Sequence, residues 1–207
     1  MYFNRRCKIT FISHGATIYS EEGRFSDAQN YPPLSEGGVE EMKNIVKYLK
    51  DRGVKNDAIY SSAAIRTQQS ADIISKLFKQ EYEIEENLTP RTCGTWNGQT
   101  FSQILDRYPN AFSDIQQYPE METQGGGESS VSFISRIKTA INNIVDNNVG
   151  NRIIIVTHPD VIQAAICAAL DIPADKLLKI YIRTGSATQI SYFENWASLV
   201  YSDHVPL

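Results

Sequence analysis

The segment Arg152–Thr157 reads RIIIVT and places four β-branched apolar residues in a row. Such a run lacks the alternation of a strand that has one face in water, and it is typical of a strand buried on both faces. A strand of this kind lies inside a sheet that helices cover on two sides. The chain must therefore supply further strands, and enough apolar helix surface to cover both faces of the sheet.

Segments of strand and helix character alternate along the rest of the chain. Further strands are predicted at Cys7–Ser13, Asp57–Ser61, Tyr82–Glu86, Lys179–Arg183, Ala187–Phe193 and Leu199–Ser202. Apolar residues spaced three and four apart predict helices between Ser35 and Gly53 and over 63–78, 101–108, 129–145 and 161–170. This order predicts an α/β fold, a three-layer α/β/α sandwich on a mostly parallel sheet.

The length of 207 residues suits a single domain over 1–207. Within it, residues 88–128 have weak periodicity and contain both the segment CGTWNG and three consecutive glycines. We expect this part to be an insertion that caps the active-site edge of the fold. Substrate specificity would come from this cap and from the polar loop 19–33.

Composition excludes several classes of protein. The net charge of −4 lacks the basic footprint of a nucleic-acid binder. No apolar run approaches the roughly 18–20 residues that a membrane helix needs. Cys7, Cys93 and Cys167 are too widely spaced for a disulfide framework or a CxxC metal site, which fits a reducing compartment. We expect a cytoplasmic protein that binds neither nucleic acid nor membrane.

Two of the three histidines, His14 and His158, directly follow predicted strands, and Ser61 and Ser62 follow a third and lead to Arg66. The carboxyl ends of parallel strands share one edge of a sheet, so these groups should meet there. One imidazole can attack phosphorus. A second, protonated imidazole and the guanidinium fork can neutralise phosphoryl oxygens. This set predicts a pocket for a small anionic substrate, with backbone donors after Gly15.

Six motifs occur in order along the chain. They are SHG at 13–15, RFS at 24–26, SSAAIRTQQSA at 61–71, GTWNG at 94–98, GGGES at 125–129 and VTHP at 156–159. With them the chain resembles the histidine phosphatase superfamily, in the phosphoglycerate mutase-like branch, from about Lys8 to Ser191.

The resemblance implies a phosphoglycerate mutase-like fold and a reaction class. His14 would be the nucleophile that becomes a phosphohistidine, and Arg66 and His158 would hold the phosphate. The reaction would be phosphomonoester hydrolysis or mutase-type transfer, without a metal or another cofactor. The resemblance leaves a homodimer open. The residues expected to bind the substrate, a phosphate ester, are Ser13, Gly15, Thr17, Arg24, Gln69, Glu128 and Arg183.

The chain departs from the family pattern where the chemistry depends on it. Ser13 replaces the arginine that precedes the nucleophile, and Pro90 stands where relatives carry the glutamate that protonates the leaving group. Loss of a general acid lowers the reaction rate by about 10²–10⁴-fold. Replacement positive charge could come from Arg91, Arg183 or Arg24, and a replacement proton from Asp160, Glu128, Glu36 or Cys93.

These departures leave three functional hypotheses open. The chain is a working phosphatase with replacement groups. It is a catalytically dead pseudo-enzyme that still binds phosphate, including on a phosphorylated partner. Or its histidines have been recruited for acid/base chemistry on a non-phosphate substrate in a biosynthetic pathway.

Overall fold

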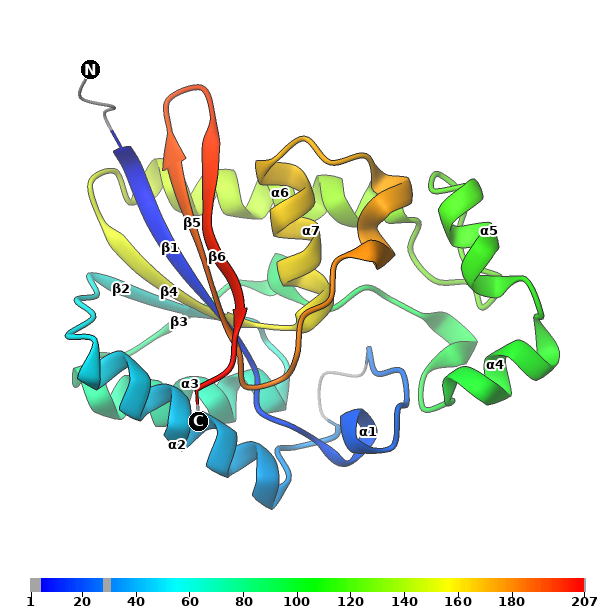
Figure 1. Ribbon diagram of the computed structural model, residues 1–207, viewed down its shortest axis with the longest axis horizontal. Coiled ribbons are helices and arrows are strands. Elements are labelled where there is room, and N and C mark those ends of the chain that lie inside the picture. Colours follow the sequence, from blue (N-terminus) through cyan, green and yellow to red (C-terminus); the bar gives the residue numbers. More distant parts are fainter. Residues whose placement is uncertain (1–4, 28–30, 207) are drawn as a thin grey trace.

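The computed structural model describes residues 5–27 and 31–206. In this part of the chain, six strands form one sheet in the order β3-β2-β4-β1-β5-β6 (Figure 1). β1, β2, β3 and β4 run parallel, and β5 and β6 complete one edge in antiparallel pairing. The strands are β1 (Arg5–Ser13), β2 (Ala58–Ser61), β3 (Glu83–Ile84), β4 (Arg152–Thr157), β5 (Ala187–Phe193) and β6 (Ala197–His204).

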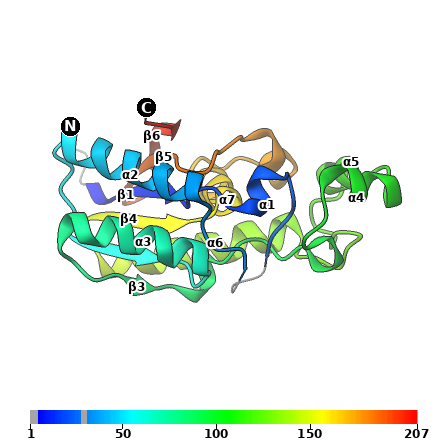
Figure 2. The ribbon, with the colours of Figure 1, turned by 90° about the horizontal axis from the view of Figure 1, so that it is seen from below.

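Helices cover both faces of the sheet (Figures 1 and 2). α2 (Glu36–Asp51) and α3 (Ile65–Phe78) pack on one face, and α6 (Ser130–Asn147) and α7 (Pro159–Ala169) pack on the other. The predicted three-layer α/β/α architecture is confirmed. No helix of the described ranges has the length and apolar character to cross a membrane.

The strand that anchored the prediction, β4, is buried on both faces. Ile153 and Ile155 belong to the apolar cluster with α6 and α7, and Ile154 and Val156 belong to the cluster with α2 and α3. Each of the four side chains is at most 1 % exposed. The alternation of consecutive β-branched residues between two cores explains the uninterrupted apolar run.

Residues 88–128 carry shorter elements at the far end of the molecule, to the right in Figure 1. These are η2 (Gly94–Trp96), α4 (Phe101–Arg107) and α5 (Ala111–Gln117), preceded by η1 (Glu86–Leu88). They enclose a separate small apolar cluster of Cys93, Trp96, Ile104, Ala111 and Ile115. The role of this segment as a cap over the active-site edge stays a prediction.

The loop after β1 is held tightly against the start of α2. The Ser35 side chain caps α2 by accepting a hydrogen bond of 3.0 Å from the Gly38 N–H. A Cβ on Gly15 would lie 2.1 Å from the Gly38 carbonyl oxygen, so the two backbones can approach this closely only as glycines. This contact fixes the path of the chain directly after His14.

The structure corrects several predicted elements. The strand predicted at Lys179–Arg183 is wrong, because η3 (Ala174–Lys179) ends there and residues 180–183 pair with no strand in the described chain. Ile182 is 4 % exposed within the α6–α7 cluster, so its β-branched side chain serves packing and not sheet pairing. The predicted loop 19–33 begins inside a short helix, α1 (Ile18–Glu21), and its residues 28–30 lie outside the described residues.

Two further differences concern length and number. The edge strand predicted at Tyr82–Glu86 is confirmed but reduced to the two residues of β3. α5 was not predicted, because residues 111–117 bury only Ala111 and Ile115 and so carry no helical stripe of apolar residues.

Candidate active site

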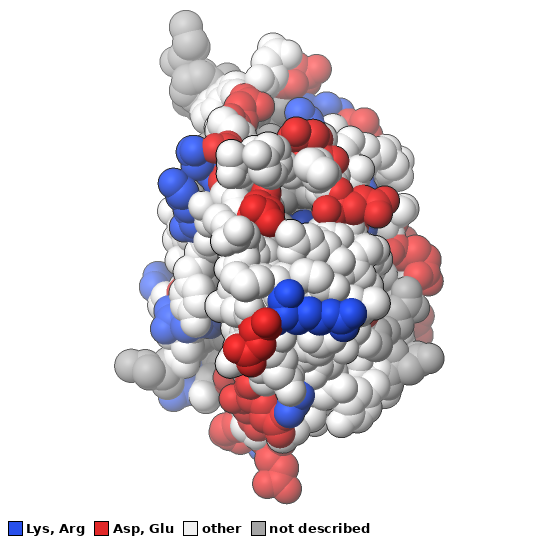
Figure 3. Space-filling view, turned by 90° about the vertical axis from the view of Figure 1, so that its right-hand side faces the viewer, with Lys and Arg blue, Asp and Glu red and all other residues white. Residues whose placement is uncertain are grey.

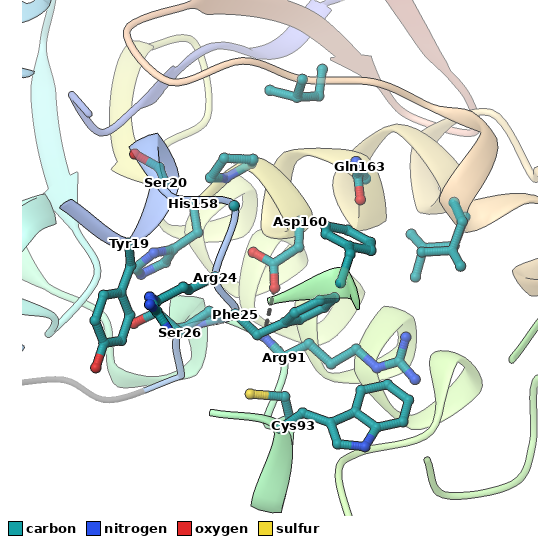
Figure 4. Close-up of a pocket in the computed structure, with 18 of the residues that line it drawn as sticks. Tyr19, Ser20, Arg24, Phe25, Ser26, Arg91, Cys93, His158, Asp160 and Gln163 are labelled. Atoms are coloured by element: carbon teal, nitrogen blue, oxygen red, sulfur yellow. Dashed lines mark hydrogen bonds between the residues drawn. The ribbon is translucent and has the colours of Figure 1, made fainter. Parts of the chain in front are cut away.

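A cavity of about 640 Å³ opens at the carboxyl ends of β1 and β4. Its walls come from the loop after β1, the start of α3, residues 90–96 and 101–123, the start of α7 and the segment after it. His14, Arg66 and His158 all line this cavity, as the shared edge of parallel strands predicts. Figure 4 shows His158 and Arg24 on one side of it and the long side chain of Arg91 extending to the other.

His14 follows β1 and is 5 % exposed. Its Nδ1 lies 2.8 Å from the Gly15 carbonyl oxygen. Since a carbonyl only accepts, the Nδ1 atom carries the proton and the lone pair of the neutral ring is on Nε2. Burial, and next the positive charge of Arg66, lower the pKa of His14 to about 3. The imidazole is therefore neutral, and nucleophilic at Nε2, near neutral pH.

His158 is the N-cap residue of α7 and is 1 % exposed. Its Nε2 lies 2.9 Å from the Ser62 hydroxyl, and among the described residues its Nδ1 has no hydrogen-bond partner. Its ring lies 5.2 Å from that of His14, centroid to centroid, at an interplanar angle of 71°. Burial, then Arg66 and His14, lower the pKa of His158 well below its usual value. The protonated form expected from sequence is thus disfavoured before an anion binds.

Arg66 stands in the first turn of α3 and is 2 % exposed. Its Nη2 donates a hydrogen bond of 3.3 Å to the carbonyl oxygen of Ser26. Burial lowers its pKa to about 10, against the opposing effects of Asp160 and Asp27, so the guanidinium stays charged at neutral pH. It supplies a fixed positive charge beside both histidines.

Asp160 lies two residues beyond His158 in the first turn of α7 and lines the same cavity. Its Oδ2 accepts a hydrogen bond of 2.8 Å from the Arg91 backbone N–H, and its Oδ1 accepts one of 2.9 Å from the Val161 N–H. Burial raises the pKa of this carboxyl, against these hydrogen bonds and the charges of Arg66 and Arg91. The protonated form is therefore favoured relative to an exposed aspartate.

Two other residues predicted to bind substrate also line the cavity. The Thr17 hydroxyl caps α1 by accepting a hydrogen bond of 3.2 Å from the Ser20 N–H. The Arg24 Nη1 donates a hydrogen bond of 2.8 Å to the Gly98 carbonyl oxygen. Both hold the walls of the cavity in place, and a substrate contact for either stays a prediction.

The remaining predicted substrate-binding residues do not line the cavity. Ser13 is buried, and its Oγ has no hydrogen-bond partner among the described residues. The Gly15 N–H lies 3.3 Å from the Ser70 hydroxyl, and the Gln69 side-chain oxygen accepts a hydrogen bond of 2.8 Å from the Leu34 N–H. Their roles in substrate binding are untested predictions.

Two charged residues of that set are paired elsewhere. Glu128 accepts two hydrogen bonds, of 3.1 and 2.8 Å, from the guanidinium of Arg136. Arg183 donates to both a carboxylate oxygen and the carbonyl oxygen of Asp203. Of the three arginines considered as a replacement charge, Arg24 and Arg91 line the cavity.

Sequence reasoning assigned specificity to residues 88–128 and 19–33, which supply much of the cavity wall, but it missed the part of the wall at residues 177–182. The aromatic residues Tyr19, Phe25, Trp96 and Phe101, with Phe112, line one part of the cavity, and residues 177–182 line another. The mostly apolar run LLKIYI at 177–182 could have indicated this wall, but strand propensity explains the same run equally well. Within residues 5–27 and 31–206, no group of three or more His, Cys, Asp or Glu side chains is placed to hold a metal ion.

Comparisons with known proteins identify the family. The family model described as histidine phosphatase superfamily (branch 1) matches residues 9–203. A metal-independent phosphoserine phosphatase of Arabidopsis thaliana is 30 % identical over 161 residues, 76 % of this chain and 66 % of the relative. Phosphoserine phosphatase 1 of Hydrogenobacter thermophilus is 25 % identical over 169 residues, 82 % of this chain and 79 % of the relative.

A solved structure gives the same picture at the level of the fold. Bacillus stearothermophilus YhfR superposes with a TM-score of 0.86 at 28 % identity, covering 96 % of this chain and 98 % of that one. The chain spans about half, 52 %, of the length of three mycobacterial relatives that it also matches.

Proposed function

The chain belongs to the histidine phosphatase superfamily (branch 1), and on that premise we propose that it hydrolyses phosphomonoesters through a phosphohistidine at Nε2 of His14. One observation carries the proposal. The neutral His14 ring keeps its Nε2 lone pair available, 5.2 Å from His158 between ring centroids, in a cavity that the charged Arg66 also lines.

In the first step, the lone pair of His14 Nε2 attacks phosphorus and the bond from phosphorus to the ester oxygen breaks. The Gly15 carbonyl oxygen, 2.8 Å from Nδ1, orients the ring and stabilises the positive charge that attack places on it. The Arg66 guanidinium binds the equatorial phosphoryl oxygens, whose charge is spread widely in the transition state. In the tautomer that we propose, His158 accepts from the Ser62 hydroxyl, 2.9 Å from Nε2, and donates its Nδ1–H to one of these oxygens.

Asp160 is the group we assign to protonate the leaving oxygen. Its carboxyl lines the cavity and is hydrogen-bonded to the backbone N–H of Arg91, next to Pro90, the position where the family resemblance implies a glutamate. The raised pKa of Asp160 keeps a proton on it to a higher pH than an exposed aspartate would. Of the alternatives, Glu128 is bound by Arg136, and burial raises the pKa of Cys93, which makes it a poor acid.

In the second step, Asp160, now ionised, removes a proton from water. The water oxygen attacks phosphorus, the phosphorus–nitrogen bond breaks, and its electron pair returns to His14 Nε2. Inorganic phosphate leaves, and both His14 and Asp160 recover their starting protonation. Because Ser13 stands where the family pattern has an arginine, Arg66 must neutralise more of the phosphoryl charge. We therefore expect slower hydrolysis than by a family member that has both arginines.

The experiment compares hydrolysis of p-nitrophenyl phosphate by the wild-type protein, His14→Ala and the control His204→Ala. His204 ends β6 and does not line the cavity. The leaving group of this ester needs little protonation, so the Pro90 position cannot mask activity. We also include phosphoserine, the substrate named in two relatives. Rapid alkaline quench and intact mass detect the phosphoryl adduct, because the phosphorus–nitrogen bond of a phosphohistidine breaks in acid.

We expect turnover and an adduct with the wild type and with His204→Ala, and neither with His14→Ala. Absence of both from the wild type would overturn the proposal. The cavity would then be assigned to anion binding without turnover, or to acid/base chemistry on another substrate, the two alternatives that the loss of Arg and Glu leaves open.

A further inference from the structure

The cavity is much larger than the phosphoryl site needs. Its volume of about 640 Å³ lies in the range that holds drug-sized molecules. His14, Arg66 and His158 account for one part of its lining, and the remainder must accommodate the alcohol portion of the ester.

One wall of this remainder is aromatic. The Phe25 ring lies 4.8 Å from Phe101 and 6.0 Å from Phe112, the latter nearly parallel at 15°. Trp96 lies 6.1 Å from Phe25 and 6.0 Å from Phe112, centroid to centroid. All four residues line the cavity. Grouped rings of this kind offer edges and faces to another ring at separations of about 4.5–7 Å.

Another wall is contributed by residues 177–182, which follow α7 in the chain. Leu177, Leu178 and Ile180 line the cavity there, together with Tyr181 and Ile182. Leu178 is 39 % exposed and Tyr181 is 76 % exposed, which places them at the mouth of the cavity. The two walls come from segments far apart in the sequence, and between them they make the non-phosphoryl part of the cavity predominantly apolar.

Carboxylate partners for an ammonium-bearing alcohol are scarce in the cavity, although Arg24 and Arg91 line it. Asp160 is the one carboxylate among the described residues that line the cavity, and it already accepts two backbone hydrogen bonds. A small zwitterion such as serine would therefore find no unengaged carboxylate for its ammonium group. Figure 3, which looks onto the α4–α5 end of the molecule, shows a broad area of uncharged residues around a few charged ones.

We propose that the preferred substrates are phosphomonoesters of bulky, apolar, ring-bearing alcohols or phenols, whose body lies between the aromatic wall and residues 177–182. This inference rests on the proposed function and specifies its substrate class. Burial of the apolar body supplies binding energy roughly in proportion to the area removed from water. Small polar esters forgo that energy and are poor substrates.

The test compares kcat/KM for phenyl phosphate, 1-naphthyl phosphate and phosphoserine. The two aryl esters differ by one fused ring and have similar leaving groups, so their ratio reports apolar binding. We expect 1-naphthyl phosphate to be preferred over phenyl phosphate by on the order of 10- to 100-fold, and phosphoserine to be the poorest of the three.

Two variants locate the preference. Leu178→Asp places a charge in the wall of residues 177–182, and Phe101→Ala, at a side chain 54 % exposed, removes a ring from the other wall. Each should reduce the naphthyl-to-phenyl ratio at least about 5-fold. Leu170→Asp is the matched control, because Leu170 is also 39 % exposed but does not line the cavity. Its ratio should equal that of the wild type.

A naphthyl-to-phenyl ratio near one, a preference for phosphoserine, or a ratio that Leu178→Asp and Leu170→Asp lower equally would overturn the inference while phosphohistidine chemistry stands. Absence of turnover with all three esters, together with no phosphoryl adduct, would overturn the proposed function itself.

Discussion

The Oδ2 atom of Asp160 accepts a hydrogen bond of 2.8 Å from the backbone N–H of Arg91. This contact brings a carboxyl from the first turn of α7 to the residue that follows Pro90. The family resemblance implies an acid at the position of Pro90, and we propose that Asp160 replaces it from α7. The arrangement suits a proton donor, because the carboxyl lines the cavity and burial raises its pKa.

Asp160→Asn should therefore impair hydrolysis according to the leaving group. For phenyl phosphate, kcat/KM should fall about 10²-fold or more, since the amide cannot donate a proton to the departing oxygen as an acid. For p-nitrophenyl phosphate the decrease should stay within about 5-fold, because this oxygen leaves without full protonation. Steady-state kinetics on both esters measure the contrast, and the exposed Asp106→Asn serves as control. Equal losses on the two esters would assign Asp160 a purely structural role.

Arg66→Ala should lower kcat/KM for p-nitrophenyl phosphate by about 10²–10³-fold, the effect of removing one preorganised donor from a transition state.

Arg183→Ala tests the prediction from sequence that Arg183 binds the substrate. Since Arg183 is bound to Asp203 and does not line the cavity, the geometry predicts a change within about 3-fold. A large loss with Arg183→Ala would show that this side chain does bind substrate.

The two buried histidines should make the folded protein sensitive to acid. The pKa of His14 falls from 6.5 to about 3 on folding. Between these two pH values His14 is therefore protonated in the unfolded chain and neutral in the native chain. This contribution to stability is complete above about pH 6.5 and is lost as the pH falls toward about 3. Thermal unfolding midpoints should decline between about pH 7 and pH 4, less steeply in His14→Asn. His204→Asn should keep the wild-type slope; a steeper decline in His14→Asn would contradict the assignment.

Glu128→Gln should affect stability more than chemistry. The carboxylate is 16 % exposed and binds Arg136, which also donates to backbone carbonyls at Asn87, Thr89 and Pro90. Loss of its charge should reduce the free energy of unfolding by about 1–2 kcal/mol, since an enclosed guanidinium loses its partner. Chemical denaturation measures this, and KM for p-nitrophenyl phosphate should stay unchanged. A raised KM with unaltered stability would instead support Glu128 as a substrate ligand.

The sequence indicated the sheet and its layers because their cause is local. The consecutive apolar side chains of RIIIVT at 152–157 can all be buried only if there is an apolar core on each face of the strand, and the structure has both cores. At Ile180 and Ile182 the same propensity misled, because their side chains pack in the α6–α7 cluster and pair with no strand of the described chain. What a strand-forming segment packs against depends on distant parts of the chain, which its own residues do not encode.

The same distinction applies to the site. His14, Arg66 and His158 could be grouped from sequence because parallel strands share one carboxyl edge. The engagement of Glu128 with Arg136, and of Arg183 with Asp203, depends on pairings between separate elements. Asp160 was one of four candidate proton donors on sequence grounds. Its contact with the Arg91 backbone distinguishes it from the others.

The neutrality of His14 and His158 also bears on how a catalytic cycle would end. Inorganic phosphate formed at His14 would face the guanidinium of Arg66 and two rings whose pKa burial lowers, in a cavity that Arg24 and Arg91 also line. Ser13 adds no second guanidinium there. A dianion beside two neutral rings is held by fewer opposite charges than a dianion beside two imidazolium rings, so product inhibition by phosphate should be weak and phosphate should dissociate quickly. The substitution that slows bond breaking would thus ease the release of what the reaction leaves behind.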